Sequence, residues 1–409
     1  VDYLRDNRDE NMGFLSKTLL PDGTEIPGTN FDYNYLQHRK VDVVSSALDF
    51  ILPFEKYKIT AGAKVSFTNT RNGINYDTSD PTLVQDDYFR YKEQIYALYA
   101  DYSREYSERF SMQLGLRMEH TRTTGISEAK DTEDKHDYTR LFPTVYLLYS
   151  PTDGHALNFS FSNRISRPSQ NMVNPFPFYQ NKYTYACGRE DLKPSYTYNA
   201  ELGYTLKNNF NVSAYYSYSD DVFFQVVDLD AETNVTSFLW ENFMKTHAFG
   251  LNNSYTFRTK WLQAYAQHGV SYRRTTSSAV TTSPEEKGWA YDASLRNTFF
   301  FNEKKTLLAT LSGSYSSRQY QGIYLMSPTY SVSAGMLYRL LDNKLNLSLN
   351  VNNLFVSHSK LETMSNGLKI IADNQFSFTS FRIGVSYTFG GDIRSKGQRN
   401  SNEDIQRRL

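Results

Sequence analysis

The chain has 409 residues with 44 basic and 44 acidic side chains, so its net charge gives no reason to expect binding to nucleic acid or to a strongly acidic partner. It contains 33 Tyr and 27 Phe, a composition that favours strands and membrane-interface belts. No stretch approaches the roughly 18 uninterrupted apolar residues of a membrane-spanning helix. The single cysteine, Cys187, cannot form an internal disulfide.

In chain order, residues 1–37 come first and are predicted to form an extracellular loop or the remnant of an upstream strand. Residues 38–390 follow as alternating strands, about fifteen by their turn signals, and each can supply the ~10 residues that a tilted strand needs to cross a membrane. Residues 391–409 are basic and polar, with too little apolar area to offset ordering entropy. This last segment is therefore predicted to be a disordered periplasmic tail.

The connections between the predicted strands fall into two classes that alternate along the chain. Tight polar turns are predicted at 54–57, 105–108, 151–154, 207–209, 257–260, 302–304 and 341–343. Long connections are predicted at 70–87, 122–137, 164–194, 226–236, 275–286, 316–329 and 356–375. In an up-and-down meander every second connection lies on the same rim, so one rim has only short turns. Outer-membrane barrels sort their connections this way, whereas a soluble sandwich with Greek-key crossings does not.

Alternation within the strands supports the same fold class. In KLNLSLNVNNLF, residues 344–355, leucines and a valine occupy every second position, with asparagines and a serine between them. The strand 59–67 has the same pattern, and so do 110–119, 196–206 and 330–339. A soluble β protein would also alternate, but tyrosines near the strand ends match the aromatic girdles of a membrane barrel. The predicted fold is therefore all-β, a transmembrane antiparallel up-and-down β-barrel whose apolar face meets lipid.

The predicted strand number has its own implication. About fifteen is odd, whereas single-chain bacterial barrels have an even number of strands. The pattern therefore predicts further strands upstream, with this chain as the back part of a larger barrel.

Several motifs then resemble a known family. NVNNLF at 350–355, followed by SFRIGVSYTFGG at 380–391, resembles the end of TonB-dependent outer-membrane receptors, which carry an Asn-Leu-Phe signature in the penultimate strand. NRISRPSQNMVNPF at 163–176 and LKPSYTYNAELGY at 192–204 resemble the Bacteroidetes-type branch of such barrels. The resemblance covers about 38–391 and implies that these are the C-terminal ~15 strands of a 22-stranded barrel with an N-terminal plug.

The resemblance also implies a function and partners. Such receptors capture a small-molecule, glycan or peptide ligand outside a Gram-negative cell and import it when the inner-membrane TonB complex pulls on a segment ahead of the plug. Neither a plug nor a TonB-contacting segment is visible in this sequence. The alternatives are a passive porin-like channel and a structural or adhesion barrel without energised transport. The expected location is the cell outer membrane, with outer-membrane lipid and a TonB complex as partners.

Candidate ligand-binding residues lie in the longest predicted loop, 165–194. Its aromatic side chains give a large contact area at low entropic cost. The alternative is that the rings pack the loop onto the barrel rim, since a loop of this length needs a small core of its own. The two roles do not exclude each other. The candidates are Phe176, Phe178, Tyr179, Tyr183 and Tyr185.

The family motif comprises Asn352, Asn353, Leu354 and Phe355. The two asparagines are expected to satisfy backbone groups where the strand leaves the sheet, rather than to bind a ligand. Polar residues predicted to face the lumen have two interpretations: contacts to a plug, or a wet polar wall. These are Arg117, Glu119, Glu201 and Arg339.

No catalytic constellation emerges from the sequence. The seven histidines are scattered, and no GxSxG or HExxH pattern accompanies them. They are assigned to structural or surface roles, because a metal or catalytic cluster needs convergent partners at short spacing. An outer-membrane hydrolase is therefore the least favoured function. We expect no enzymatic activity, no metal and no cofactor.

Overall fold

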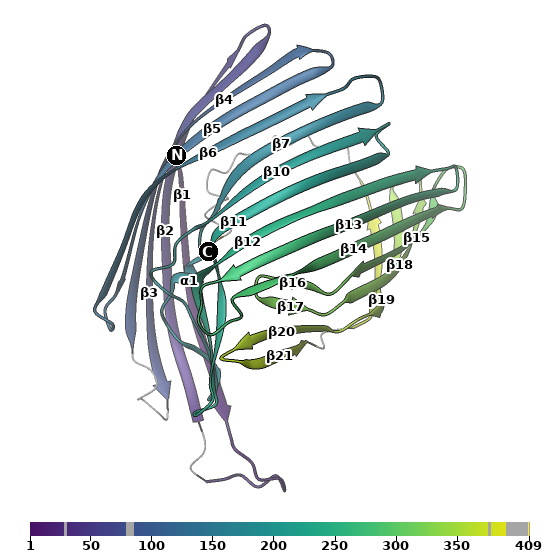
Figure 1. Cartoon of the computed structure of the whole chain (residues 1–409). Coiled ribbons are helices and arrows are strands. Elements are labelled where there is room, and N and C mark those ends of the chain that lie inside the picture. The colour runs from purple at the N-terminus through teal and green to yellow at the C-terminus, as the bar shows by residue number, and fades with distance from the viewer. Residues whose placement is uncertain (28–30, 79–85, 375–377, 390–407, 409) are drawn as a thin grey trace.

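The computed structural model describes residues 1–27, 31–78, 86–374, 378–389 and 408. Within these residues, sixteen antiparallel strands follow one another in chain order around one curved wall (Figure 1). The strands of this meander are β1 (Asp2–Ser16), β2 (Phe31–Pro53), β3 (Tyr57–Thr78), β4 (Asp87–Ser107), β5 (Phe110–Ser127), β6 (Thr132–Tyr149), β7 (His155–Ser166), β10 (Ser195–Leu206), β11 (Phe210–Asp230), β12 (Val235–Arg258), β13 (Leu262–Ser277), β14 (Glu285–Phe300), β15 (Leu307–Ser316), β18 (Thr329–Leu340), β19 (Leu345–Val356) and β22 (Ser380–Tyr387).

Six smaller strands and one helical turn complete the described elements. The connection from β7 to β10 contains α1 (Gln170–Val173), β8 (Phe178–Asn181) and β9 (Thr184–Cys187), and β9 joins the wall by parallel pairing with β12. The remaining four form a separate sheet at the loop-bearing rim: β16 (Gln319–Gln321), β17 (Tyr324–Met326), β20 (Ser359–Ser365) and β21 (Leu368–Asn374). No described helix is long and apolar enough to cross a membrane.

The all-β, up-and-down architecture predicted from the sequence is confirmed, and fifteen of the sixteen meander strands lie after residue 30. The extra strand is β1, within the range 1–37 that was predicted as loop or strand remnant. β1 pairs with β2 from Asp2 opposite Ser45 to Ser16 opposite Phe31. Strand structure thus begins well before the predicted boundary at residue 38, because β2 continues its alternation through the polar stretch 31–43.

Two of the predicted long connections are in fact tight. β5 ends at Ser127 and β6 begins at Thr132, while β11 ends at Asp230 and β12 begins at Val235. The segments 122–137 and 226–236 are mostly strand. In 122–137 polar side chains occupy both faces, so this hairpin looks like a loop in the sequence. The genuinely long excursions at this rim include 167–194, 317–328 and 357–379.

The strand registers separate an apolar outer face from a polar inner face. In β19, Leu347 and Leu349 lie opposite Tyr338 and Met336 of β18, and all four are at least 36% exposed. Their neighbours Asn346 and Ser348 fall on the other face with period two, as predicted. The apolar side chains of KLNLSLNVNNLF thus lie on the outer face.

The core lies where the loops fold against the inner wall. One cluster joins the wall to the 167–194 connection, and another joins the four-stranded sheet to the projecting part of β11 and β12. In the second cluster, Tyr324 donates its hydroxyl to the backbone carbonyl of Gln225 at 2.8 Å.

Of the range 391–409, predicted as a periplasmic tail, only Arg408 is described. Its guanidinium binds Glu93 in β4, with nitrogen–oxygen distances of 2.6 and 3.1 Å, so this one residue lies against the inner wall. The rest of the predicted tail lies outside the described residues.

Candidate functional site

The candidate site is the inner wall together with the connection that covers it, here called the inner loop (residues 167–194). The inner loop is held by its own backbone bonds and by the wall. The amide of Arg189 donates to the carbonyl of Met172 at 2.8 Å, and the amide of Gly188 donates to the carbonyl of Asn174 at 3.0 Å. These bonds close the loop into a compact unit, and the pairing of β9 with β12 fixes it to the wall.

An aromatic cluster fastens the inner loop to β2. Phe31, Tyr33 and Tyr35 alternate along the inner face of β2 and are almost fully buried. Tyr179 lies 5.1 Å from Tyr33 between ring centroids, and Phe178 meets Tyr35 edge-on at 5.8 Å. Such aromatic pairs add about 0.5–1.5 kcal/mol each beyond their buried area.

The five predicted ligand-binding aromatics divide into two groups. Phe176 is 2% exposed, and Phe178 and Tyr179 pack against the cluster, so these three rings attach the loop to the wall. Tyr185 contacts Tyr179 at 5.2 Å between centroids. Tyr183 alone among the five has an exposed ring, at 47%. The packing role is therefore seen directly for Phe176, Phe178 and Tyr179, and the ligand-binding role stays a prediction.

A buried ion-pair cluster lies on the inner wall beside this aromatic cluster. Glu93 and Glu119 project from adjacent strands β4 and β5, with side chains only 3% and 6% exposed. Arg167, at the start of the inner loop, reaches Glu119 at 2.5 Å and Glu93 at 4.0 Å. Burial opposes the charge on Arg167, but the two carboxylates outweigh it and hold the pKa of the guanidinium above its ordinary value.

The cluster is only partly visible in the sequence. Arg117 and Glu119 were predicted to face the lumen, and they are paired at 2.5 Å. Glu93 and Arg167 were missed, although Glu93 occupies the inner position in the alternation of β4. Arg167 follows the last residue of β7, where strand periodicity no longer indicates the direction of a side chain.

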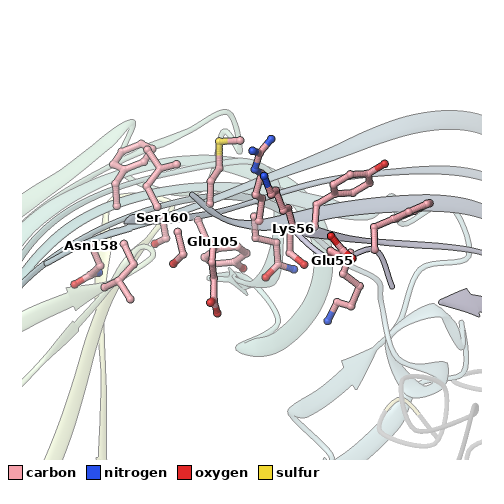
Figure 2. Close-up of a pocket in the computed structure, with 17 residues that line it drawn as sticks. Glu55, Lys56, Glu105, Asn158 and Ser160 are labelled. Atoms are coloured by element: carbon pink, nitrogen blue, oxygen red, sulfur yellow. The ribbon is translucent and has the colours of Figure 1, made fainter. Parts of the chain in front are cut away.

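The wall is hollowed near the short-turn rim. An open cavity of about 750 Å³ runs from the β2–β3 turn to β7. Figure 2 shows Glu105, Asn158 and Ser160 pointing to the same side of the wall, with Glu55 and Lys56 at the far end. Many of the side chains that line this cavity are polar. Among the described residues, no group of His, Cys, Asp and Glu is arranged to hold a metal ion.

The NNLF motif forms a bulge. Asn353 has φ 56°, and the register between β18 and β19 shifts at this point. The Asn353 amide group donates to the carbonyl of Phe378 at 3.4 Å, and Thr379 donates its hydroxyl to the carbonyl of Asn353 at 2.9 Å. Asn352 bonds Ser380 at 3.3 Å. Asn353 thus bonds a backbone carbonyl, whereas Asn352 bonds a side-chain hydroxyl, and Phe355 lies on the outer face, 66% exposed.

Comparison with known proteins bears on this arrangement. A model of the outer membrane protein beta-barrel family matches residues 1–387. The chain belongs to the outer membrane protein beta-barrel family. Membership places the protein in the cell outer membrane, with the outer face of the meander against lipid. A comparison with curated protein sequences finds no significant match.

Solved structures with a similar fold include receptors and transporters. The ferric yersiniabactin uptake receptor FyuA from Yersinia pestis matches with a TM-score of 0.60 at 16% identity. The match covers 95% of this chain and 59% of the FyuA chain. Copper transporter OprC matches with a TM-score of 0.60 at 12% identity, and the match covers 94% of this chain and 65% of the OprC chain. The ferric citrate transporter FecA matches with a TM-score of 0.58 at 13% identity, and the match covers 94% of this chain and 62% of the FecA chain.

The resemblance to TonB-dependent receptors predicted from the sequence is thus confirmed at the level of the fold. This family member spans about 53–65% of the length of similar solved chains.

Proposed function

We propose that this family member forms the barrel portion of an outer-membrane receptor that imports a small ligand with energy supplied through TonB. The observation that carries the proposal is the inner loop. Residues 167–194 fold back against the inner wall and bury both aromatic rings and charged side chains there. A receptor needs its interior filled and its passage controlled, whereas a general diffusion pore needs an open lumen.

The similar solved structures support the same class of function. By name they bind or carry ferric chelates and copper, so metal chelates are the first ligands to test for this protein. In this proposal, the exposed ring of Tyr183 is the first candidate among the loop aromatics for ligand contact. The buried rings of the same loop hold it in position.

The test is uptake by cells that produce the protein. Accumulation of a panel of radiolabelled ferric chelates and copper is compared with a deletion strain, with and without a protonophore. The proposal predicts accumulation of at least one ligand that needs both the protein and the proton gradient. Accumulation that persists under the protonophore would favour the passive channel. No dependence on the protein for any panel ligand would reject uptake of this ligand class.

A further inference from the structure

The outer wall carries a row of cations beyond its lipid-facing band. Lys40 in β2 lies directly opposite Arg71 in β3, and Arg71 lies directly opposite Arg90 in β4. Lys92, two residues along β4, lies opposite Asn69 on the same face. Like charges placed directly opposite each other across strands destabilise a sheet. A row of this kind therefore calls for a compensating anion.

These side chains point to the outside of the barrel. In β2, Lys40 alternates with the buried residues Arg39 and Val41, and it shares its face with Val44 and Leu48, whose side chains are exposed. The other members of the row occupy equivalent positions in the alternation of β3 and β4.

The row lies just beyond an aromatic belt. Phe67 of β3 and Tyr96 of β4 meet edge-on, with their ring centroids 5.8 Å apart on the outer face. Arg71 is four residues further along its strand than Phe67, and Lys92 is four residues from Tyr96, which is about 13 Å along an extended strand. With a strand tilt near 45°, this becomes a height of about 9 Å, within reach of the headgroup layer for long flexible cations. The row is on the side of the long loops, and therefore in the outer leaflet.

Comparable cations elsewhere on the outer wall are neutralised by carboxylates of the protein. Lys245 pairs with Asp220, and both Arg274 and Lys287 pair with Glu285. Further pairs on this wall are Arg5–Asp42, Arg122–Asp137 and Lys135–Glu133.

The row on β2–β4 differs from these pairs. Arg90 reaches Glu128 at 3.1 Å, but Lys40, Arg71 and Lys92 form no ion pair with any residue that the structure describes. The nearby carboxylate of Asp42 is bound by Arg5 at 2.6 Å. Lys40 acts on the Asp42 carboxylate electrostatically but without a direct ion pair. Among the described residues, Arg71 and Lys92 have no carboxylate in an ion pair, so the row keeps uncompensated positive charge at the membrane surface.

We propose that Lys40, Arg71 and Lys92 bind the phosphate groups of a lipid headgroup in the outer leaflet. Guanidinium and ammonium groups are the side chains that recognise phosphate, and basic clusters beside a hydrophobic span attract anionic headgroups. A bound phosphate also removes the repulsion within the row. The occupant is a lipid rather than a free anion, because the row is continuous with the lipid-facing wall and the aromatic belt.

The test uses the unsubstituted parent protein, purified in detergent and titrated with diphosphorylated lipid A while native mass spectrometry measures the bound lipid. The test variant is the triple Lys40→Gln, Arg71→Gln, Lys92→Gln. The matched control, Lys245→Gln, Arg274→Gln, Lys287→Gln, removes the same charge from cations that have carboxylate partners. Resistance of each variant to unfolding in SDS at room temperature verifies the fold.

We expect the test variant to bind the lipid about a hundredfold more weakly, since each cation near an anionic surface contributes roughly fivefold. The control should change affinity by less than about threefold, because its cations already have carboxylate partners. The variant Arg71→Lys keeps the charge, so its affinity for the lipid should stay close to that of the parent protein. Dephosphorylated lipid A should bind the parent as weakly as the phosphorylated lipid binds the test variant.

Three results would overturn the proposal. The first is equal lipid affinity in the parent and the test variant. The second is an equal loss in the control, which would indicate a general effect of net charge. The third is displacement of the lipid by millimolar inorganic phosphate, which would assign the row to a free anion. Failure of this test leaves the proposed import function untouched, because the row is on the opposite face from the inner loop.

Discussion

At the residue scale, Asn353 illustrates how a single backbone conformation shapes the end of a strand. Its φ of 56° is in the left-handed region, which asparagine and glycine tolerate and β-branched residues do not. Its backbone N–H donates to the hydroxyl oxygen of Ser333 at 3.1 Å. The NNLF motif thus serves the geometry of the bulge between β18 and β19.

We expect Asn353→Val to destabilise the β18–β19–β22 end of the sheet by about 1–2 kcal/mol, because valine cannot adopt the left-handed conformation without strain. Asn353→Gly should cost less, since glycine adopts it freely. Hydrogen exchange of the β22 amides measures the difference. Equal protection in both variants would show that the motif has another role.

The reactivity of the Cys187 thiol gives a second prediction at this scale. Burial is the main cause that raises the pKa of its thiol to about 11, and the thiol contacts the carbonyl of Pro175 at 3.1 Å. Because only the thiolate reacts with alkylating reagents, the reactive fraction at pH 8 should be roughly a hundredfold below that of an ordinary thiol. Alkylation by iodoacetamide should therefore be slow in the folded protein and accelerate as pH approaches 11. Fast labelling at pH 8 without denaturant would contradict the packing of the inner loop.

Arg167 tests the buried ion-pair cluster. Arg167→Met removes a partner from the buried carboxylates Glu119 and Glu93, which should weaken the attachment of the inner loop by about 3 kcal/mol. Arg164→Met, at an exposed position nearby, serves as the control. Limited proteolysis within 167–194 provides the measurement. Unchanged protection in Arg167→Met would mean that the ion pairs contribute little.

At the element scale, the inner loop shows one of the two roles that its aromatic composition left open in the sequence, the packing of rings onto the wall. Strand alternation predicts which face a residue occupies, but it says nothing about a segment without regular periodicity. Whether Phe176 or Tyr183 is buried depends on contacts with β2, which is more than a hundred residues away in the chain. The sequence therefore predicted an aromatic loop with a small core of its own, but it could not show which of the rings are buried.

The pair Phe176→Ala and Tyr183→Ala separates packing from ligand contact. Truncating the buried Phe176 should cost about 3–5 kcal/mol of loop stability and make 167–194 sensitive to protease. Tyr183→Ala should leave protease protection unchanged and, if the ring contacts ligand, lower affinity for the imported ligand. Equal effects of both substitutions on protection would contradict the division between buried and exposed rings.

At the scale of the whole molecule, period-two alternation between turn signals predicted the meander. The prediction worked because every strand must satisfy the same constraint, an apolar outside and a polar inside. It failed where a strand leaves the membrane: β1 and the hairpins at 128–131 and 231–234 lack the contrast between faces, and the start of β2 has its aromatic side chains on the inner face. The four-stranded sheet at the rim was also invisible, because it joins two loops distant in sequence.

The central claim is that the meander faces lipid on one side and a polar interior on the other. The most direct test is a spin-label scan of residues 346–351 in the full-length protein, with Cys187 replaced by alanine and the protein reconstituted in lipid vesicles. Labels at Leu347, Leu349 and Val351 should collide with lipid-soluble oxygen, and labels at Asn346, Ser348 and Asn350 should not. The account would be contradicted if oxygen accessibility did not alternate along residues 346–351, or if the labels at the asparagine and serine positions were the accessible ones.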